Sequence, residues 1–598
     1  MPLIVQKFGG TSVADSEKIL AAARKAIRAH NEGNQVVMVV SAMGKNTDLL
    51  VKLANEVNEN PPAREMDMLL STGEQVSVAL MAMAVDSMGY KAVSLTGGQI
   101  GIRTDSTHTK ARIRSISTDR MRRHLDDGKI VIAAGFQGID ENWDITTLGR
   151  GGSDTTAVAL AAVLQADSCE IYTDVDGVYT TDPRIMPEAR RVSQVSYDEM
   201  LELASLGAGV MHSRSIEFAK KFNVPIHVRS SFSDTPGSMI VDEPEMKHRA
   251  VSGATLTKDE ARVTVKNVPD VPGTSYEIFS RIAACNVTVD MIVQNVGSAG
   301  VAEISFTVPK SELKVTLEAL DSARLAIGDF GVDHDSQVAK VSVVGHGMAT
   351  QSGVAGRVFG ALAAHEINIQ MITTSEIKIS TLVSRENALK ALRAVHGAFE
   401  LEKAPDEVTA GEPSKSAVPL RSQDDAVNVV ERLRQMELDM EQLTIDSIYM
   451  DDTQGRVTIH GVADKPGMAQ HVFNEIAKAS IFVDMIVQSF GSEELANLSF
   501  TVPRKDVAAA VKVAEKVASE LGCGKVSSSE EVAKLTVSGI GLRSHTGVAI
   551  RMFKALAEGS VNLMMINTSE VRVNVVVEGA DGPRALKKLQ DVFHDVMR

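Results

Sequence analysis

The first part of the chain alternates short apolar runs with alanine-rich amphipathic stretches. The apolar runs at 3–7 and 36–40 predict buried strands, and similar runs predict strands at 92–95, 129–133 and 170–173. The stretches between them predict helices, including one that extends through Ile27 and one over 74–88 that ends at Gly89. Strands that are apolar throughout and separated by helices predict an α/β fold, with a mostly parallel sheet covered by helices on both faces.

Glycine-rich and polar loops follow these strands, at the sheet edge where ligands collect in parallel α/β folds. The most distinctive loop, at 147–156, reads TLGRGGSDTT. Gly151 and Gly152 leave backbone N–H groups open to an anion, and Arg150 offers a fork that suits a carboxylate or phosphate. Ser153 and Asp154 stand where the N-cap of the following apolar helix is expected. Taken alone, a glycine-rich loop of this kind is more often a plain glycine turn capped by aspartate, and the other motifs of the chain are what favour an anion site.

The second part of the chain is an internal repeat. VDMIVQ occurs at 289–294 and 483–488, SFTVP at 305–309 and 499–503, and TSE at 374–376 and 568–570, all at one constant offset. Each copy contains two halves in the ferredoxin-like order β-α-β-β-α-β, which predicts four small modules. We expect a first domain at 1–245, modules at 246–335, 336–402, 426–530 and 531–598, and a polar linker at 403–425.

Charge and cysteine content narrow the class of protein. The net charge of −15 argues against a nucleic-acid partner, because binding phosphates needs clustered Lys and Arg. Cys169, Cys285 and Cys523 are far apart and form neither a metal-ligand spacing nor a disulfide framework, which favours a reducing cytoplasm. We expect no signal peptide, no run long and apolar enough to span a bilayer, and no membrane partner.

Four motifs and the repeat together resemble an aspartate kinase. The motifs are KFGGTS at 7–12, STGE at 71–74, GRGGSD at 149–154 and YTDVDGVYTTDPR at 172–184, all typical of the amino acid kinase fold. The repeats resemble ACT domains, the amino-acid-sensing modules of biosynthetic enzymes, and four of them match the cyanobacterial arrangement. The resemblance covers essentially the whole chain. A P-loop is not present, because the sequence contains no G-x-x-x-x-G-K-[ST].

The resemblance implies an activity and its control. The γ-phosphate of ATP passes to the β-carboxylate of L-aspartate and gives 4-phospho-L-aspartate, the first step toward lysine, threonine and methionine. Lysine, threonine or both are the expected feedback inhibitors, acting allosterically through the ACT modules. A homodimer formed through these modules is expected as well.

The resemblance also assigns residues to the catalytic site. Lys7 is expected to neutralise the transferring phosphoryl group and Asp154 to orient Lys7, whereas Glu74 holds the substrate amino group. Read without the resemblance, Glu74 completes a capping box with Ser71 at a helix start, and Asp182 belongs to a turn. The other expected substrate contacts are Thr47, Arg150 (on the α-carboxylate), Gly151, Gly152 and Ser153. The expected nucleotide contacts are Lys7, Phe8, Gly9, Gly10, Ser41, Thr173, Asp174, Tyr179, Asp182 and Arg184, with Mg²⁺ bound mainly through ATP and not by a protein metal site.

Paired positions in the repeat are candidates for effector binding. In each copy an Asp-x-Pro-Gly turn ends a strand and starts a helix, leaving N–H groups for an amino-acid carboxylate. A VDMIVQ strand supplies an Asp and a Gln as partners for the effector's amino group and side chain, and a Ser-Glu pair forms a further set. These candidates are Asp270, Pro272, Gly273, Asp290, Gln294, Ser375 and Glu376 in the first copy, and Asp464, Pro466, Gly467, Asp484, Gln488, Ser569 and Glu570 in the second.

Two other functions are weighed against the kinase. The first is a non-catalytic amino-acid sensor whose kinase domain is only a scaffold; it is favoured by Gly209, where many family members carry a lysine near the nucleotide. The second is another kinase of this fold, acting on glutamate, acetylglutamate or UMP. The intact Lys7, Glu74, Arg150 and Asp154 argue against the sensor. The repeats and the STGE and GRGGSD motifs argue against the other substrates.

Overall fold

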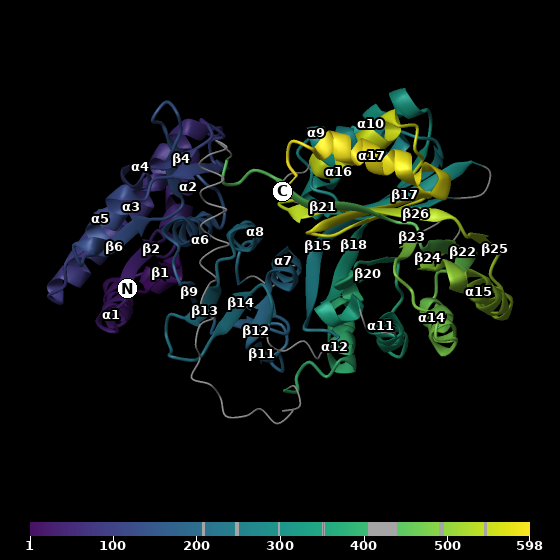
Figure 1. Ribbon diagram of the computed structural model, residues 1–598, viewed down its shortest axis with the longest axis horizontal. Coiled ribbons are helices and arrows are strands. Elements are labelled where there is room, and N and C mark those ends of the chain that lie inside the picture. Colours follow the sequence, from purple (N-terminus) through teal and green to yellow (C-terminus); the bar gives the residue numbers. More distant parts are fainter. Residues whose placement is uncertain are drawn as a thin grey trace.

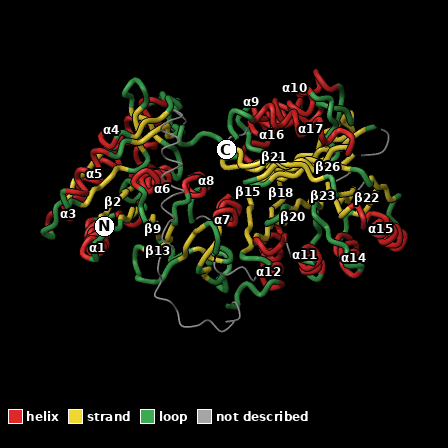
Figure 2. The backbone as a smooth tube through the Cα atoms, in the orientation of Figure 1, coloured by secondary structure: helices red, strands yellow, loops and turns green. Residues whose placement is uncertain are grey.

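The computed structural model describes residues 1–205, 210–244, 250–296, 300–349, 351, 353–404, 439–489, 495–542 and 547–597. Gly209 and most of the predicted linker at 403–425 therefore lie outside the described residues. Figure 1 shows two halves. The half that contains the N-terminus is named the catalytic half after the expected activity, and the other, in which sheets lie between two layers of helices, is named the regulatory half. Figure 2 shows the same layering with strands in yellow between helices in red.

An eight-stranded sheet forms the centre of the catalytic half. Its order is β12-β14-β13-β9-β1-β2-β6-β3, and neighbouring strands are parallel except β13 and β14. The predicted fold class is therefore confirmed. The strands are β1 (Leu3–Phe8), β2 (Gln35–Val40), β3 (Ala92–Leu95), β6 (Ile130–Ala134), β9 (Ser168–Thr173), β12 (Gln194–Ser196), β13 (Ile226–Ser230) and β14 (Ser238–Val241).

Both faces of this sheet are buried, which explains why its central strands are apolar throughout. Along β2, Val37 and Val39 face one core, whereas Met38 and Val40 face the other. Helices α1 and α3 contribute to the second core and α6 and α8 to the first. The helices of this half are α1 (Ser16–Asn31), α2 (Asn46–Val57), α3 (Ala63–Ser87), α4 (Gly97–Ile100), α5 (Asp119–Asp126), α6 (Gly152–Leu164), α7 (Tyr197–Ser205) and α8 (Ser213–Phe222).

Two smaller sheets complete the catalytic half. One has the order β5-β4-β7-β8 and leads, at the end of β8, into the glycine loop at 147–156, and the other pairs β10 with β11. Their strands are β4 (Ile102–Thr104), β5 (Ile113–Ile116), β7 (Gln137–Ile139), β8 (Ile145–Thr147), β10 (Val178–Tyr179) and β11 (Arg191–Val192).

Helix α3 differs from the sequence-based expectation in two ways. It begins at Ala63 rather than near Glu74, so Glu74 lies in mid-helix. The expectation that no run could span a bilayer is also wrong by length and composition, because α3 is the one such helix among the described residues. Half of its apolar window is nevertheless buried, and α3 packs on α1, β3 and β8 as a core helix does.

The regulatory half contains a ten-stranded sheet and a four-stranded sheet, with orders β16-β17-β15-β18-β20-β19-β23-β24-β22-β25 and β21-β26-β28-β27. Figure 1 shows α9, α10, α16 and α17 on one side of these sheets and α11, α12, α14 and α15 on the other. The elements of the first copy are β15 (Gly253–Pro269), α9 (Thr274–Ala284), β16 (Asp290–Val296), β17 (Val301–Pro309), α10 (Leu313–Ile327), β18 (Gly331–Val344), α11 (Val354–Ala363), β19 (Met371–Thr374), β20 (Lys378–Ser384) and α12 (Ala388–Ala398). Those of the second are β21 (Thr444–Asp451), β22 (Gln454–Ala463), α14 (Met468–Lys478), β23 (Ile486–Ser489), β24 (Leu495–Pro503), α15 (Val507–Leu521), β25 (Val526–Ser529), β26 (Val532–Ile540), α16 (Gly547–Glu558), β27 (Met565–Thr568), β28 (Arg572–Glu578) and α17 (Gly582–Phe593).

The four modules are interleaved, whereas the sequence predicted them one after another. Residues 253–257 of β15 pair with 340–344 of β18, so the second module takes its outer strand from ahead of the first. In the second copy, β21 precedes the third module yet pairs with β26 of the fourth. The expected boundaries between 335 and 336 and between 530 and 531 therefore do not separate complete sheets. The sequence predicted that the second and fourth modules each end in a strand after their last helix. In the structure that position is taken by an antiparallel strand from earlier in the chain, residues 253–257 of β15 in the second module and β21 in the fourth.

The modules also pair within one chain. Strand β19 of the second module joins β23 of the third edge to edge, with Ile372 opposite Gln488 and Thr373 opposite Val487. The first and fourth modules pair as well: β16 lies beside β27, and α9 lies against α16. The edge pairing that the resemblance implied between two chains therefore occurs here between the two copies of the repeat.

Candidate active site

A cleft of about 1130 Å³ opens at the carboxyl ends of β1 and β2. This is the edge at which parallel sheets place their ligands, and the volume is sufficient for two small substrates. The residues that the structure brings together here, out of those predicted, are Lys7, Gly10, Ser41, Thr47, Glu74, Arg150, Gly151, Gly152, Ser153 and Asp154.

An ion pair lies at the base of the cleft. Lys7, next to the end of β1, points to Asp154 in the first turn of α6, and Lys7 Nζ lies 2.5 Å from Asp154 Oδ1. Their side chains are only 11% and 13% exposed, so water screens the pair weakly. The carboxylate thus holds the ammonium group in one place at the cleft surface.

The glycine loop presents backbone N–H groups, but not with the cap that the sequence suggested. The N-cap of α6 is Gly151, with φ of 72° and no side-chain cap, whereas Ser153 and Asp154 lie inside the first turn. Only glycine fits at 151, because a Cβ there would lie 2.3 Å from the Cβ of His212. The first turn of α6 consequently has no side-chain cap among the described residues, and helix N-termini of this kind attract anions.

Glu74 is buried and faces the cleft from the middle of α3. The Ala42 N–H donates to its Oε1 at 3.1 Å, and Gly73 allows this approach, because a Cβ at 73 would lie 2.8 Å from the Ala42 Cβ. The buried Oε2 has no hydrogen-bond partner among the described residues. Burial raises the pKa of Glu74 to about 7, against the opposing effect of the Ala42 hydrogen bond. The capping box is wrong, because Ser71 Oγ donates to the Met68 carbonyl instead.

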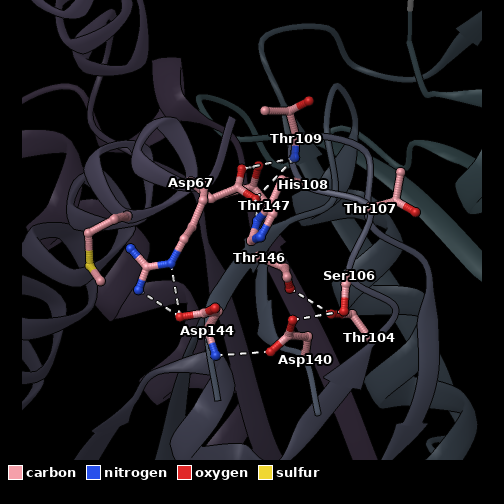
Figure 3. A network of polar contacts seen from close by, with 12 residues as sticks. Asp67, Thr104, Ser106, Thr107, His108, Thr109, Asp140, Asp144, Thr146 and Thr147 are labelled. Carbon is pink, nitrogen blue, oxygen red and sulfur yellow. Dashed lines mark hydrogen bonds and ion pairs between the residues drawn. The ribbon is translucent and has the colours of Figure 1, made fainter. Parts of the chain in front are cut away.

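A buried aspartate that the sequence did not reveal ties α3 to the glycine loop (Figure 3). Asp67 lies two helical turns before Glu74 and accepts hydrogen bonds from the Thr109 N–H at 3.0 Å and Thr147 Oγ1 at 2.5 Å. His108 Nδ1 lies 2.7 Å from the same carboxylate. Because Thr147 opens the loop that carries Arg150, Asp67 sets the spacing between the helix of Glu74 and that loop.

One group with the geometry of metal ligands occurs among the described residues, beside this network. It consists of His108, Asp140 and Asp144. Asp140 already accepts from Ser106 Oγ and from two backbone N–H groups, and Asp144 accepts from Arg64. These oxygens therefore have protein donors, as Figure 3 shows, and serve to shape the sheet edge under the cleft.

His212, at the other side of the glycine loop, is a further cleft residue that the sequence did not reveal. It packs against Gly151, and burial together with the nearby Arg214 holds the pKa of its imidazole below the usual range. The lowered pKa favours the neutral imidazole, so the positive charge on this side of the cleft comes from arginines such as Arg150 and Arg214.

The predicted nucleotide residues divide into two groups. Near the cleft, the Gly9 N–H donates to the Tyr172 carbonyl at 3.3 Å and Phe8 stacks on the Tyr172 ring, which places Thr173 and Asp174 beside the KFGGTS turn. Farther along, Tyr179 donates to Asp176, and Arg184 pairs with Asp182 at 2.8 Å. Seven of the predicted nucleotide contacts do not line the cleft itself: Phe8, Gly9, Thr173, Asp174, Tyr179, Asp182 and Arg184.

Comparisons with known proteins agree with this geometry. Residues 2–230 match the model of the amino acid kinase family, and residues 341–399, 457–517 and 535–593 each match that of the ACT domain. An aspartokinase of Pseudomonas aeruginosa is 51% identical over 405 residues, which cover 67% of this chain and 98% of that protein. The chain belongs to the aspartokinase family. The predicted resemblance is therefore confirmed.

Solved aspartokinase structures match as well. The aspartate kinase from Synechocystis is 39% identical, with a TM-score of 0.52 over 99% of this chain and 98% of that one. Aspartokinase III of E. coli, in complex with aspartate and ADP in its R-state, is 25% identical, with a TM-score of 0.58 over 67% of this chain and 100% of that one. Its T-state complex with lysine and aspartate has a TM-score of 0.53, also at 25% identity, over 66% and 99% of the two chains.

Between paired ACT modules, the chain forms two matching sets of polar contacts. In one, Asn562 Nδ2 donates to Asp270 Oδ1 at 2.8 Å, and Gln294 donates to the Leu563 carbonyl at 2.7 Å. In the other, Asn368 donates to Asp464 at 2.7 Å and Gln488 to the Ile369 carbonyl at 3.1 Å. Gly273 and Gly467, both with positive φ, begin the adjoining helices. The two asparagines, which the sequence did not single out, come from the partner module in each case.

The other predicted effector residues lie elsewhere. Asp290 and Gln294 were expected to meet one ligand, but Asp290 lines a different cavity with Ser569 and Glu570. The strand is bulged between them, where Met291 has φ of 47°, and this breaks the alternation that would have aligned them. The same separation holds for Asp484 and Gln488, since Asp484 lines a cavity with Ser375.

Two of these carboxylates and Glu376 are ion-paired across strands and modules. Asp290 contacts Lys340 and Asp484 contacts Lys534. Glu376 of the second module contacts Arg572 of the fourth. These three predicted effector ligands thus already have a cationic partner within the chain.

Proposed function

We propose that this chain transfers the γ-phosphoryl group of ATP to the β-carboxylate of L-aspartate, under feedback control by amino acids that bind its ACT modules. The observation that carries the proposal is the convergence in one cleft of the Lys7–Asp154 pair, the glycine loop and Glu74 Oε2, which has no hydrogen-bond partner in the described part of the chain. Relatives named aspartokinases, one of them solved with aspartate and ADP, support the same substrates.

The buried Glu74 is the proposed contact for the substrate ammonium group. Its free Oε2 accepts a hydrogen bond from the ammonium, and the ionised carboxylate compensates the positive charge. Arg150, immediately before the N-cap of α6, binds the α-carboxylate as a bidentate fork. Thr47 and Ser153 supply hydroxyls, and Gly151 and Gly152 supply N–H groups. These contacts leave the β-carboxylate directed toward the Lys7 side of the cleft.

Phosphoryl transfer then needs position and charge neutralisation more than a protein nucleophile. A β-carboxylate oxygen of aspartate attacks the γ-phosphorus, the bond to the β,γ-bridging oxygen breaks, and ADP leaves with that electron pair. Lys7 stabilises the charge on the phosphoryl oxygens, while Asp154 holds its ammonium group. Since Asp154 is engaged with Lys7, Mg²⁺ is expected to enter bound to the phosphates of ATP, where it supplies further neutralisation.

The nucleotide is placed along the KFGGTS turn, with Phe8, Gly9, Gly10 and Ser41 near the phosphates. Thr173 and Asp174 adjoin this turn through the Gly9–Tyr172 hydrogen bond. We keep Tyr179, Asp182 and Arg184 as predicted contacts farther along the nucleotide. Gly9 and Gly10 support this placement, because a Cβ at Gly10 would lie 2.8 Å from the Ala42 carbonyl oxygen, so the backbone approaches closely there.

Lysine and threonine are the proposed effectors, each bound between paired modules. Asp270 with Gln294 and Asn562, and Asp464 with Gln488 and Asn368, form two sites with the same ligand chemistry for an amino acid. The E. coli relative solved with lysine supports this class of effector. We further propose a homodimer formed through the ACT modules and a cytoplasmic location.

The proposal is tested by phosphorylation of L-aspartate with ATP and Mg²⁺, with the product trapped as the hydroxamate. We expect turnover that lysine and threonine suppress when added singly or together. A Lys7→Met variant is expected to lose about 10²–10³-fold in kcat while it still binds aspartate, because it lacks only the phosphoryl contact. Absence of turnover in the unmodified chain, with amino-acid binding intact, would instead support the sensor. Turnover that ignores both amino acids would remove the effector assignment.

A further inference from the structure

The segment just ahead of β21 is anchored on the catalytic half. The Met440 N–H donates to the Arg114 carbonyl at 2.9 Å, and the Glu441 N–H donates to the Ile113 carbonyl at 3.2 Å, so the segment extends the edge of β5. Met440 is buried in the core of the kinase domain. Because β21 belongs to the fourth module, this contact fixes the second ACT copy against the wall of the cleft.

Glu441 forms an ion pair with Arg214, which lines that wall of the cleft. Arg214 Nε lies 2.7 Å from Glu441 Oε2, and Arg214 NH2 lies 2.8 Å from Glu441 Oε1, which is a bidentate pair. The two side chains are 15% and 9% exposed. A mostly buried guanidinium that meets one carboxylate through both Nε and NH2 is held in one orientation, and Glu441 is its ion-pair partner among the described residues.

The remaining N–H groups of Arg214 reach the backbone of the glycine loop at 147–156, named the substrate loop below, and of the neighbouring Ala111. Arg214 NH1 donates to the Leu148 carbonyl at 2.5 Å, and NH2 donates to the Ala111 carbonyl at 2.6 Å. The Ala111 N–H in turn donates to the Thr147 carbonyl at 2.9 Å. Leu148 stands two residues before Arg150, so the plane of the Arg214 guanidinium sets where the loop places its own guanidinium.

We propose that Glu441 is a positioning residue for the substrate loop, supplied to the catalytic site by the second ACT copy. Glu441 orients Arg214, Arg214 fixes Leu148, and the loop then holds Arg150 where an α-carboxylate binds. The inference rests on the proposed function, since it takes aspartate as the ligand of Arg150. Through this chain of contacts the regulatory half also influences the affinity for aspartate directly, at a point separate from the proposed effector sites.

The test is the Glu441→Gln variant of the full chain, which keeps the size of the side chain but removes its charge. The Michaelis constant for aspartate is expected to rise on the order of tenfold, with that for ATP nearly unchanged, because only the loop side of the cleft loses its support. Asp439→Asn is the matched control: Asp439 lies in the same segment, half-exposed and 3.8 Å from Arg114, and its loss should leave both constants unchanged.

A double variant separates positioning from general structure. If Glu441 acts through Arg214, the double variant Arg214→Gln with Glu441→Gln has the same Michaelis constant for aspartate as Arg214→Gln alone. Additive effects, or equal weakening of aspartate and ATP, would overturn the proposal. Should Glu441→Gln unfold at the assay temperature, Glu441→Asp is used, which keeps the charge but shortens the reach, and the same selective rise is required.

The two proposals fail in different ways. If the unmodified chain does not phosphorylate aspartate, the proposed function fails. If it does, and Glu441→Gln binds aspartate in calorimetry as tightly as the unmodified chain does, the positioning role of Glu441 alone is wrong.

Discussion

At the scale of single residues, Glu74 is the most unusual group in the cleft. A carboxyl with a pKa of about 7 is half protonated near neutral pH, yet it binds the substrate ammonium only when ionised. The Michaelis constant for aspartate should therefore fall by about tenfold between about pH 6 and about pH 8 and level off above that range. Initial-rate measurements across this range, at saturating ATP, check the prediction.

Glu74→Gln is the control for this pH dependence. Because an amide cannot ionise, the Michaelis constant of this variant for aspartate is expected to be high and independent of pH over the same range. Its Michaelis constant for ATP should stay close to that of the unmodified chain. A flat profile in the unmodified chain would show that ionisation of Glu74 does not govern binding.

The residues of the site differ in how far the sequence alone could predict them. Lys7, Arg150 and Asp154 lie in short motifs next to a strand end and a helix start, where local pattern predicts an anion site. The role of Glu74 came from the family resemblance, and local pattern misplaced it at a helix start. Asp67, Asn368 and Asn562 were missed because each acts on a partner far away in the chain, and no local pattern marks such contacts.

At the scale of elements, the start of α6 depends on a glycine with no room beside it. Gly151→Ala combines a left-handed backbone with a Cβ 2.3 Å from that of His212, so the loop must move away from its position. We expect kcat/KM for aspartate to fall at least about tenfold. Steady-state kinetics and thermal unfolding together check this.

Gly33→Ala is the matched comparison. Gly33 has φ of 92° but no atom within 4 Å of the added Cβ, so this variant measures the backbone strain alone. It should lose about 1 kcal/mol of stability and retain the kinetics of the unmodified chain. If both variants keep normal kinetics, the tight contact with His212 has no role in placing the loop.

The elements also show where prediction from sequence ends. The apolar runs located β1, β2, β3, β6 and β9, and the signal is strongest in β2 and β6, because strands buried on both faces are apolar almost throughout. The interleaving of the ACT modules was not predictable in the same way. Alternating apolar residues in 253–257 and in β21 indicate a strand, but the pattern is identical whichever neighbour the strand pairs with.

At the scale of the whole molecule, both ACT pairs meet the catalytic half at one buried ionic contact. Glu202 of α7 lies 2.7 Å from Lys378 Nζ of the second module and accepts from the Glu570 N–H of the fourth at 3.1 Å. All three residues are buried, and burial raises the pKa of the Glu202 carboxyl, with the nearby Glu570 adding to the rise. Helix α7 precedes His212 and Arg214 in the chain, which connects this contact to the cleft.

We expect this contact to transmit inhibition. Lys378→Met leaves Glu202 without its cation, and this single change should destabilise the chain by about 3–5 kcal/mol. Combining it with Glu202→Gln replaces the ion pair by two neutral side chains of similar size and should restore most of that stability. Thermal unfolding of both variants measures the difference, and the restored double variant is then suitable for assays of regulation.

In that double variant, lysine and threonine should still bind, because Asp270, Asn562, Asp464 and Asn368 are unchanged, but the concentration needed for half inhibition should rise several-fold. Calorimetry measures the binding and the hydroxamate assay the inhibition. Inhibition as strong as in the unmodified chain would show that the signal passes elsewhere, with the Arg214–Glu441 contact as the next path to test. A selective loss of inhibition would instead mean that effector binding and catalysis are coupled through α7, since an allosteric effect requires a contact that differs between the two states.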